Sequence, residues 1–220
     1  MDKLTQINDM ITELRSNQAV EFIEQTHAAA LPQDQQDSLL EELQNSRHAD
    51  HQELFKDYIR FPMKINIAWE YKMRDEYQMG GRINLHNIAI VVLDEEFNAR
   101  GEGVEQQVKQ TEYKYFDKDM NDGEDFGATL IVPEQLKKLN TGILLDGKHY
   151  RTSLSYSEYL DQLVITKGFL YWQFLFCTDP LADDLRADFR QNYFSRMLED
   201  LPDLFPDHDY RRLKELADEF

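Results

Sequence analysis

The sequence has one cysteine in 220 residues, Cys177, so no disulfide can form within the chain. A lone cysteine is typical of proteins in a reducing compartment. The longest apolar run is far shorter than the roughly 20 residues that a membrane span needs. The opening residues, MDKLTQINDM, lack the basic start and apolar block of a secretory signal. We therefore expect a cytoplasmic protein without a membrane-spanning segment.

Basic residues are also scarce. Lysine and arginine number 24 against 42 aspartate and glutamate residues, which gives a formal net charge of −18. A surface this negative repels a phosphate backbone, so we expect no direct binding to a nucleic acid. The charge serves either to keep the protein soluble or to present an acidic face to a basic partner.

Apolar residues are plentiful enough for a folded core. Hydrophobic residues make up 41% of the chain and aromatic residues 12%, too many for a disordered protein. The most apolar stretch runs from Tyr150 to Pro180, and its segment from Phe169 to Phe176 holds five aromatic residues. Because each large aromatic ring buries roughly 150 to 250 Å², we expect this stretch to form the centre of one domain over residues 1–220. Periodicity does not decide whether residues 168–178 form a helix or a strand, but the length of the run favours an α-helix.

The hydrophobic period changes twice along the chain. Residues 1–61 show helical spacing, whereas residues 63–73 alternate between apolar and polar and predict a strand. Gly80-Gly81 allows a turn, and 82–94 and 104–116 predict two further strands. The pattern therefore predicts an α+β fold with N-terminal helices over 1–61, a mostly antiparallel sheet over 62–155 and C-terminal helices over 156–220.

Shorter signals place the later elements. Asp146-Gly147 predicts a two-residue hairpin, and Ser155 with Glu158 has the spacing of a capping box at a helix start. Asp179-Pro180 predicts the start of a long helix that ends before Pro202.

The sequence contains no complete metal-binding motif. Asp117, Asp119, Asn121 and Gly123 suggest a calcium loop, but the EF-hand glycine and bidentate glutamate positions fall on Asp122 and Ala128. His48 and His51 have helical spacing but lack further ligands in defined places. We therefore predict no metal and no cofactor.

Catalytic motifs are missing too. Neighbouring carboxylates such as Glu95-Glu96 point in different directions on a helix or strand, and there is no phosphate-binding loop or nucleophile elbow. Cys177 has apolar neighbours and no histidine close in sequence, which favours an inert thiol. An enzyme stays open as an alternative, with His86 or His149 as a base between the sheet and the aromatic segment.

The acidic excess is concentrated between residues 94 and 125, a segment with 11 acidic and four basic residues. Most of these carboxylates fall on predicted connections, which are exposed and free to specialise. Phe97, Phe116 and Phe126 are interleaved with them and could anchor a basic protein. The predicted partner-binding residues are Glu95, Glu96, Asp117, Asp119, Asp122, Glu124 and Asp125.

The segment from Gly142 to Leu163 joins a short strand, a DG turn and a second strand to Ser-Tyr-Ser-Glu-Tyr-Leu. It resembles the closing part of the SUKH superfamily, in which a Ser-Phe-x-x-Phe-Leu-like helix start follows the sheet. That resemblance implies an intracellular immunity protein that neutralises a toxin, or a regulator of the kind known for yeast cell-wall synthesis. It assigns no functional residue.

The sequence therefore favours a non-catalytic cytoplasmic protein that binds a basic partner, such as a toxin, through an acidic face. Besides the enzyme, a second alternative is a nucleic-acid mimic that occupies the cationic groove of a DNA-binding protein. Mimicry requires carboxylates at regular spacing along one exposed face, and the helix predicted after Pro180 offers them only irregularly.

Overall fold

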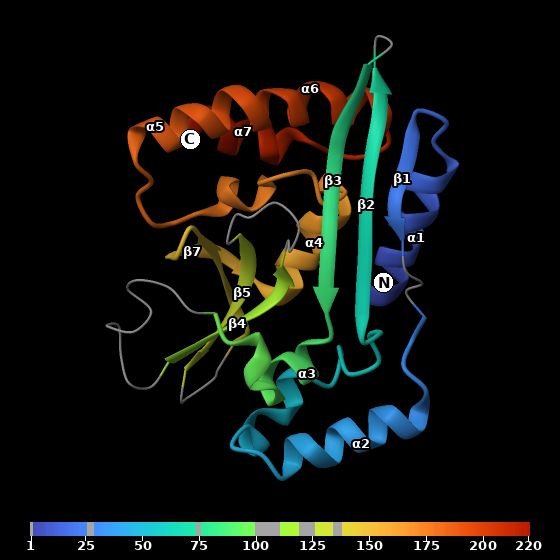
Figure 1. Cartoon of the computed structure of the whole chain (residues 1–220), viewed down its shortest axis with the longest axis vertical. Helices are drawn as coiled ribbons and strands as arrows, with labels where there is room; N and C mark the ends of the chain where they lie inside the picture. Colours follow the sequence, from blue (N-terminus) through green and yellow to red (C-terminus); the bar gives the residue numbers. More distant parts are fainter. Residues whose placement is uncertain (1, 26–28, 74–75, 100–110, 119–125, 134–137) are drawn as a thin grey trace.

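The structure is a computed structural model that describes residues 2–25, 29–73, 76–99, 111–118, 126–133 and 138–220. The described residues form seven α-helices and one seven-stranded antiparallel sheet, so the fold is α+β, as predicted. The strands lie side by side in chain order, and each pairs antiparallel with the next. Figure 1 shows the long strands β2 and β3 flanked by β1 and α1, with helices α5 to α7 at the upper end and α2 at the lower end.

The bounds of the strands are β1 (Val20–Gln25), β2 (Lys64–Met73), β3 (Glu76–His86), β4 (Thr111–Lys118), β5 (Gly127–Pro133), β6 (Asn140–Leu145) and β7 (Lys148–Ser155). The pairing is extensive within β1 to β3 and within β4 to β7. Between β3 and β4 the described residues form one register pair, Leu85 opposite Asp117. In the part of the chain that the structure describes, the sheet therefore consists of two well-paired parts that meet at this pair, which we call the seam.

The α-helices are α1 (Lys3–Ser16), α2 (Gln33–Gln44), α3 (Ile88–Leu93), α4 (Tyr156–Thr166), α5 (Asp183–Asp188), α6 (Ser195–Leu204) and α7 (Arg211–Glu219). Short 3₁₀ helices are η1 (Ala49–Leu54), η2 (Glu95–Phe97) and η3 (Trp172–Phe176), and a π-helical turn, η4 (Phe189–Phe194), joins α5 to α6. Among the described residues, no helix combines the length and the hydropathy that crossing a bilayer requires.

The main core gathers side chains from α1, α4, η3, α6 and α7 against the strands. Trp172 of η3 and Trp69 of β2 are completely buried in it. The prediction that the aromatic stretch supplies the core is thus confirmed, although its last part forms a turn and a 3₁₀ helix. Neither an α-helix nor a strand suits this segment, because Lys167, Gly168 and Tyr171 all adopt positive φ angles.

Two sequence predictions were wrong because short apolar runs have an ambiguous period. Residues 1–61 are not purely helical: β1 pairs with β2 at the edge of the sheet. The predicted strand 82–94 ends at His86, and the apolar run after it is the buried helix α3. The side chain of Asn87 accepts a hydrogen bond from the Ala89 backbone N–H and so caps this helix.

Gly80 and Gly81 do not form the predicted turn but lie inside β3. A Cβ atom at Gly80 would lie 2.1 Å from Cζ3 of Trp69, and one at Gly81 would lie 2.5 Å from the carbonyl oxygen of Gly168. Glycine is therefore required here because the Trp69 ring and the end of α4 approach the strand closely.

Several local signals were correct. Asp146 and Gly147 join β6 to β7 with positive φ at both residues, as a tight hairpin needs. Ser155 and Glu158 form the capping box that begins α4. Asp179, however, caps no helix: it accepts hydrogen bonds from the side chain and backbone N–H of Arg151, and α5 begins only at Asp183.

Candidate functional site

Two of the predicted partner-binding residues, Glu95 and Glu96, are exposed on the short helix η2. The side chain of Asp94 accepts a hydrogen bond from the Glu96 backbone N–H and fixes the start of this helix. Next to them, the ring of Phe97 packs edge-on against His86 with centroids 4.9 Å apart. The two carboxylates thus stand on a supported part of the surface.

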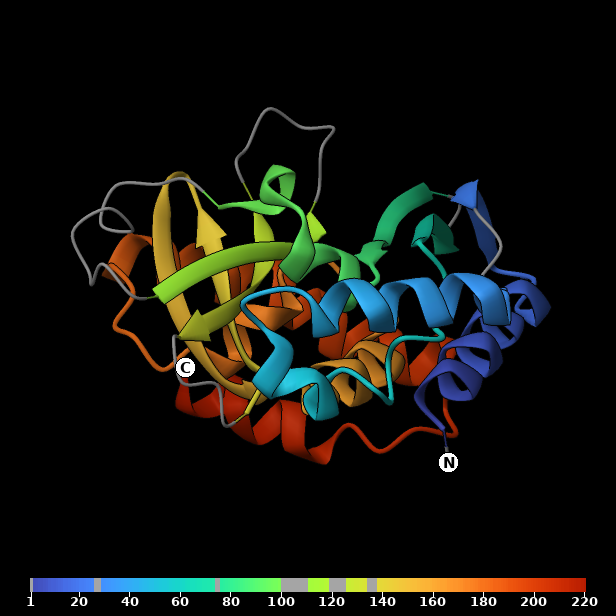
Figure 2. The ribbon, with the colours of Figure 1, turned by 90° about the horizontal axis from the view of Figure 1, so that it is seen from below.

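Helix α2 contributes a larger acidic surface that the sequence analysis did not single out. Its charged residues, Asp34, Asp37, Glu41 and Glu42, are all acidic and exposed. The sequence contains no lysine or arginine between Arg15 and Arg47. Helix α2 packs on α3, which η2 follows directly, so these carboxylates share one end of the molecule with Glu95 and Glu96. Figure 2 shows α2 lying across that end.

Asp117 lies elsewhere, and its position corrects the prediction that it belongs to an exposed acidic loop. It is part of β4 and is only 8% exposed. Its Oδ1 accepts a hydrogen bond from the Asn84 backbone N–H at 2.8 Å, and its Oδ2 accepts one from the Tyr159 hydroxyl at 2.8 Å. Asp117 therefore fastens β3 and α4 to the seam of the sheet and is not available to a partner.

The remaining predicted residues, Asp119, Asp122, Glu124 and Asp125, lie outside the described residues, as do Asn121 and Gly123 of the suggested calcium loop. Where the structure describes the chain, no three histidine, cysteine, aspartate or glutamate side chains cluster closely enough to hold a metal ion. His48 is buried, and that burial lowers its pKa.

A small polar cavity adjoins Asp117 at the seam. It is lined by Arg82 and Asn84 from β3, by Phe126 before β5, and by Tyr171 and Gln173 from the aromatic segment. The space open to a water-sized sphere is about 20 Å³. Asn84 and Gln173 are both 6% exposed, so this is an interior polar site rather than a surface groove.

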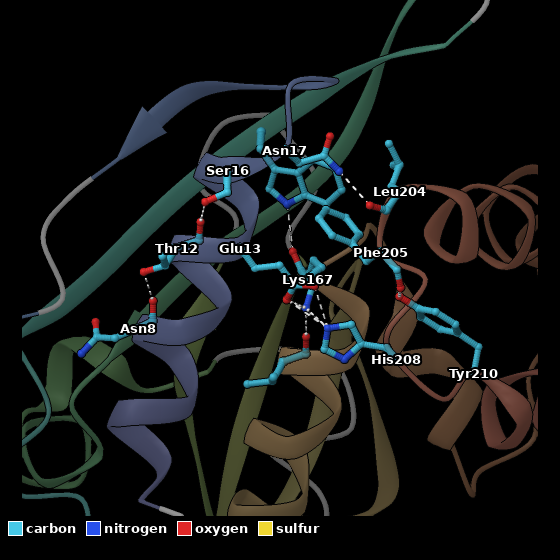
Figure 3. A network of polar contacts seen from close by, with 12 residues as sticks. Asn8, Thr12, Glu13, Ser16, Asn17, Lys167, Leu204, Phe205, His208 and Tyr210 are labelled. Atoms are coloured by element: carbon cyan, nitrogen blue, oxygen red, sulfur yellow. Dashed lines mark hydrogen bonds and ion pairs between the residues drawn. The ribbon is translucent and has the colours of Figure 1, made fainter.

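A second polar cluster joins distant parts of the chain (Figure 3). The Nζ of Lys167, whose side chain is fully buried, donates to Glu13 Oε2 at 2.6 Å and to the Val164 carbonyl at 2.9 Å. His208 Nε2 lies 2.9 Å from that Nζ and 2.9 Å from both Glu13 carboxylate oxygens. The Lys167 carbonyl in turn accepts a hydrogen bond from Trp69 Nε1 at 2.9 Å.

Burial lowers the pKa of Lys167, and the hydrogen bond to Glu13 opposes this effect. Burial by itself would raise the pKa of Glu13, but hydrogen bonds from Lys167 and His208 outweigh it and hold that pKa below its usual value. The combination of lysine, glutamate and histidine looks like a catalytic set. Lys167, however, lines neither the seam cavity nor the two larger cavities beside Cys177 and Tyr58. The cluster serves to hold α1, α4 and the C-terminal segment together.

The two histidines of the enzyme alternative lie on different strands, His86 at the end of β3 and His149 in β7. Burial lowers the pKa of each to about 4. His149 packs on the Tyr113 ring at 4.0 Å and its Nε2 lies 3.0 Å from the Thr129 hydroxyl. Neither histidine lines the seam cavity, the 370 Å³ cavity beside Cys177 or the 520 Å³ cavity beside Tyr58. These cavities therefore give the enzyme alternative no support.

Cys177 lines the 370 Å³ cavity, yet it is a poor nucleophile. Burial raises the pKa of its thiol to about 11, so the thiolate is rare near neutral pH. The Sγ atom also donates to the Asp179 carbonyl at 3.4 Å. The prediction of an inert thiol agrees with this environment.

Sequence reasoning missed Glu13, Lys167 and His208, as well as Asn84 and Gln173. The sequence carried one usable signal: Lys167-Gly168 directly follows an amphipathic helix, where a residue with positive φ is common. Comparison with protein-family models, with curated proteins and with solved structures finds no match to this chain.

Proposed function

We propose that this protein is a non-catalytic cytoplasmic binding protein that holds a basic protein through the acidic end of the molecule. The observation that supports the proposal best is the surface of α2, where four exposed carboxylates stand without a single basic residue in the helix. Carboxylates arranged in this way speed the encounter with a basic partner through long-range attraction.

The neighbouring surface adds features of a binding site. Glu95 and Glu96 extend the acidic area, and Lys114 of β4 points inward, donating from Nζ to the Asp94 carbonyl at 2.9 Å. Met63 is 53% exposed, and its carbonyl accepts a hydrogen bond from the backbone N–H of Asn87, the cap of α3. An exposed apolar side chain is suited to be an anchor for a partner.

An immunity protein that neutralises a toxin fits this surface. Such a protein must bind quickly and needs no chemistry of its own, and many nucleic-acid-cleaving toxins are basic because their substrate is acidic. The resemblance of residues 142–163 to the SUKH superfamily supports the same class of function. The partner would then be the product of a neighbouring gene.

A nucleic-acid mimic is a second candidate, favoured by one observation. Asp34, Asp37 and Glu41 recur at i, i+3 and i+7, so they form a regular stripe along the exposed side of α2. Competition with duplex DNA distinguishes the two candidates. Duplex DNA should compete with a nucleic-acid mimic for the partner's cationic groove. It should not affect an immunity protein that binds its partner outside that groove.

The test begins with affinity capture from the source organism in 50 mM salt, followed by expression of each captured basic protein and of the neighbouring gene product. Association is then measured for the wild type and for the α2 variant Asp34→Asn, Asp37→Asn, Glu41→Gln, Glu42→Gln. The association rate should fall by about tenfold or more in the α2 variant and should depend less on salt.

The matched control removes four exposed carboxylates at the opposite end of the molecule, through Asp183→Asn, Asp184→Asn, Asp188→Asn and Glu199→Gln. Both variants change the net charge by the same amount, so only the position differs. Equal rates for the two variants would show that net charge alone acts, and would contradict an acidic binding face on α2.

A further inference from the structure

The outer edge of β1 is open in the part of the chain that the structure describes. β1 stands at the end of the strand order, and among the described residues β2 is the only strand that pairs with it. Figure 1 shows β1 on the side of β2 that faces away from β3. An edge strand of this kind presents backbone N–H and C=O groups with which another extended segment can pair.

The register shows which backbone groups face outward. The Lys72 backbone N–H donates to the Ala19 carbonyl at 2.9 Å, so these two residues form a hydrogen-bonded pair. Hydrogen-bonded pairs alternate along an antiparallel ladder, which makes Glu21 and Glu70 the next such pair. Phe22, the residue after Glu21, therefore directs both its N–H and its C=O away from β2.

The side chains along this edge favour a basic neighbour. Glu21 is exposed and lies directly opposite Glu70 of β2, and like charges in such a pair repel each other. A lysine or arginine opposite Glu21 on an added strand would have its Cβ about 5 Å from that of Glu21 and would offset the repulsion. Ile23 is 50% exposed, and an apolar side chain on the added strand would cover it.

We propose that β1 binds an extended, basic segment of a partner protein as an added strand of the sheet. The inference rests on the proposed function for the basic character of the partner, and it adds the conformation of the bound segment and the place where it binds. One partner suits both surfaces, because no lysine or arginine occurs between Arg15 and Arg47, a stretch that contains both β1 and α2. Basic side chains of the segment therefore meet carboxylates at either surface.

A second copy of this chain does not suit the edge. Two β1 strands would bring two sets of Glu21 and Glu70 together, on chains that each carry a net charge of −18. The register also shifts between Phe22 and Glu24, and a bulge of this kind limits the length over which identical edges can pair. A short basic segment needs only the backbone groups before the bulge.

The test is an NMR titration of the full chain with the peptide acetyl-Lys-Val-Lys-Val-Lys-Val-Lys-amide, called the Lys-Val peptide. One comparison peptide replaces each valine by proline, which keeps the charge but removes N–H groups that a strand needs. The other replaces each lysine by glutamate. The Lys-Val peptide should bind about tenfold or more tightly than either. Equal dissociation constants for the valine and proline peptides, or no saturable binding of the Lys-Val peptide, would overturn the proposal.

Hydrogen exchange locates the peptide on the edge. The outward N–H of Phe22 should exchange rapidly in the free protein, and saturation with the Lys-Val peptide should slow it by about tenfold or more. The N–H of Glu21 faces β2 and is the internal control, because its exchange should be slow in both states. Unchanged exchange of Phe22 at saturation would overturn the proposal. So would slow exchange of Phe22 in a free protein that sediments as a dimer, because a second copy would then cover the edge.

The variant Ile23→Lys ties the binding to β1. It places a cation beside the added strand and should weaken binding of the Lys-Val peptide by about tenfold. Gln191→Lys adds the same charge at an exposed position of η4 and should bind the peptide as the wild type does. Equal affinities of the two variants would contradict a binding site at β1.

This proposal and the proposed function can fail separately. If the Lys-Val peptide leaves the exchange of Phe22 unchanged, the edge site fails, while slow association of the α2 variant with a captured partner would still support the acidic face. If instead the two variants that each lack four carboxylates associate at equal rates, the acidic face on α2 fails. Protection of Phe22 by the peptide would then still support the edge site.

Discussion

Nζ of Lys167 lies 2.6 Å from Oε2 of Glu13, and this ion pair joins the end of α4 to the end of α1 across 154 residues of sequence. At the start of α1, Lys3 forms an ion pair with Asp161 at the middle of α4. The two ion pairs therefore link the two helices at two points. In the Lys167–Glu13 pair, the Lys167 side chain is fully buried, whereas the Glu13 side chain is 34% exposed.

Removal of Glu13 should destabilise the protein more than removal of Lys167. Glu13→Leu leaves a buried ammonium without its counter-charge, which costs about 3 to 5 kcal/mol. Lys167→Met leaves Glu13, which reaches solvent and still contacts His208, so the cost should be only about 1 to 3 kcal/mol. Urea unfolding at pH 7.5 measures both values.

The double variant Glu13→Leu, Lys167→Met completes the cycle. It should be more stable than Glu13→Leu alone, because the uncompensated cation is gone. If the three variants lose stability additively, the two side chains do not interact and the cluster plays no part in joining α1 to α4.

Tyr156 and Tyr159 offer a matched pair on one face of α4. Both are 1% exposed, but only the Tyr159 hydroxyl has a partner, Asp117, whereas the Tyr156 hydroxyl is buried without one among the described residues. Tyr159→Phe should cost about 1 to 3 kcal/mol because it removes a hydrogen-bond donor from a buried carboxylate. Tyr156→Phe should be neutral or stabilising in the same urea experiment, and a similar loss in both variants would contradict the role assigned to Asp117.

The stability should fall between pH 6.5 and about 4 because of His86 and His149. Burial depresses the folded-state pKa of each from 6.5 to about 4, so the unfolded chain takes up their protons first. The stabilisation is complete above pH 6.5 and is lost as the pH falls toward 4. Near pH 5 these two histidines should together contribute about two protons to the uptake on unfolding, and His48, whose pKa burial also lowers, adds to it. The slope of unfolding free energy against pH measures the total.

The variant His86→Gln tests how much His86 contributes to the pH dependence of stability. It should reduce the proton uptake near pH 5 by about one proton, while its stability above pH 7 reports the packing change alone. An unchanged slope in this variant would mean that the pKa of His86 is not depressed in the folded state.

Gly80→Ala tests the close contact within β3. The added methyl group would lie 2.1 Å from Cζ3 of Trp69, a completely buried ring, and overpacking of this kind costs about 1 to 3 kcal/mol or more. The smaller ring of Trp69→Phe should recover part of that loss in the double variant. No loss on Gly80→Ala, measured by thermal unfolding, would show that the strand can move away from Trp69.

Features that depend on neighbouring residues could be derived from the sequence alone. The alternation in residues 63–73, the Asp146-Gly147 hairpin and the Ser155–Glu158 capping box each follow from local sterics or local hydrogen bonds, and each was found in the structure. The short runs 20–25 and 88–93 failed because six residues contain too few repeats to distinguish a strand from a helix. The sequence shows the α2 carboxylates as part of a stretch without basic residues. It does not show that they lie at the same end of the molecule as Glu95 and Glu96.

Only the tertiary structure decided what becomes of individual charges. Asp117 reads as one more residue of an acidic loop, yet β3 and α4 supply two donors to it and bury it. Lys167 reads as a surface lysine after a helix, yet Glu13 and His208, from opposite ends of the chain, enclose it. The sequence set the fold class and the net charge, because both sum over many residues. Whether one charge is exposed or buried depends on segments that are distant in sequence, and no local pattern carries that information.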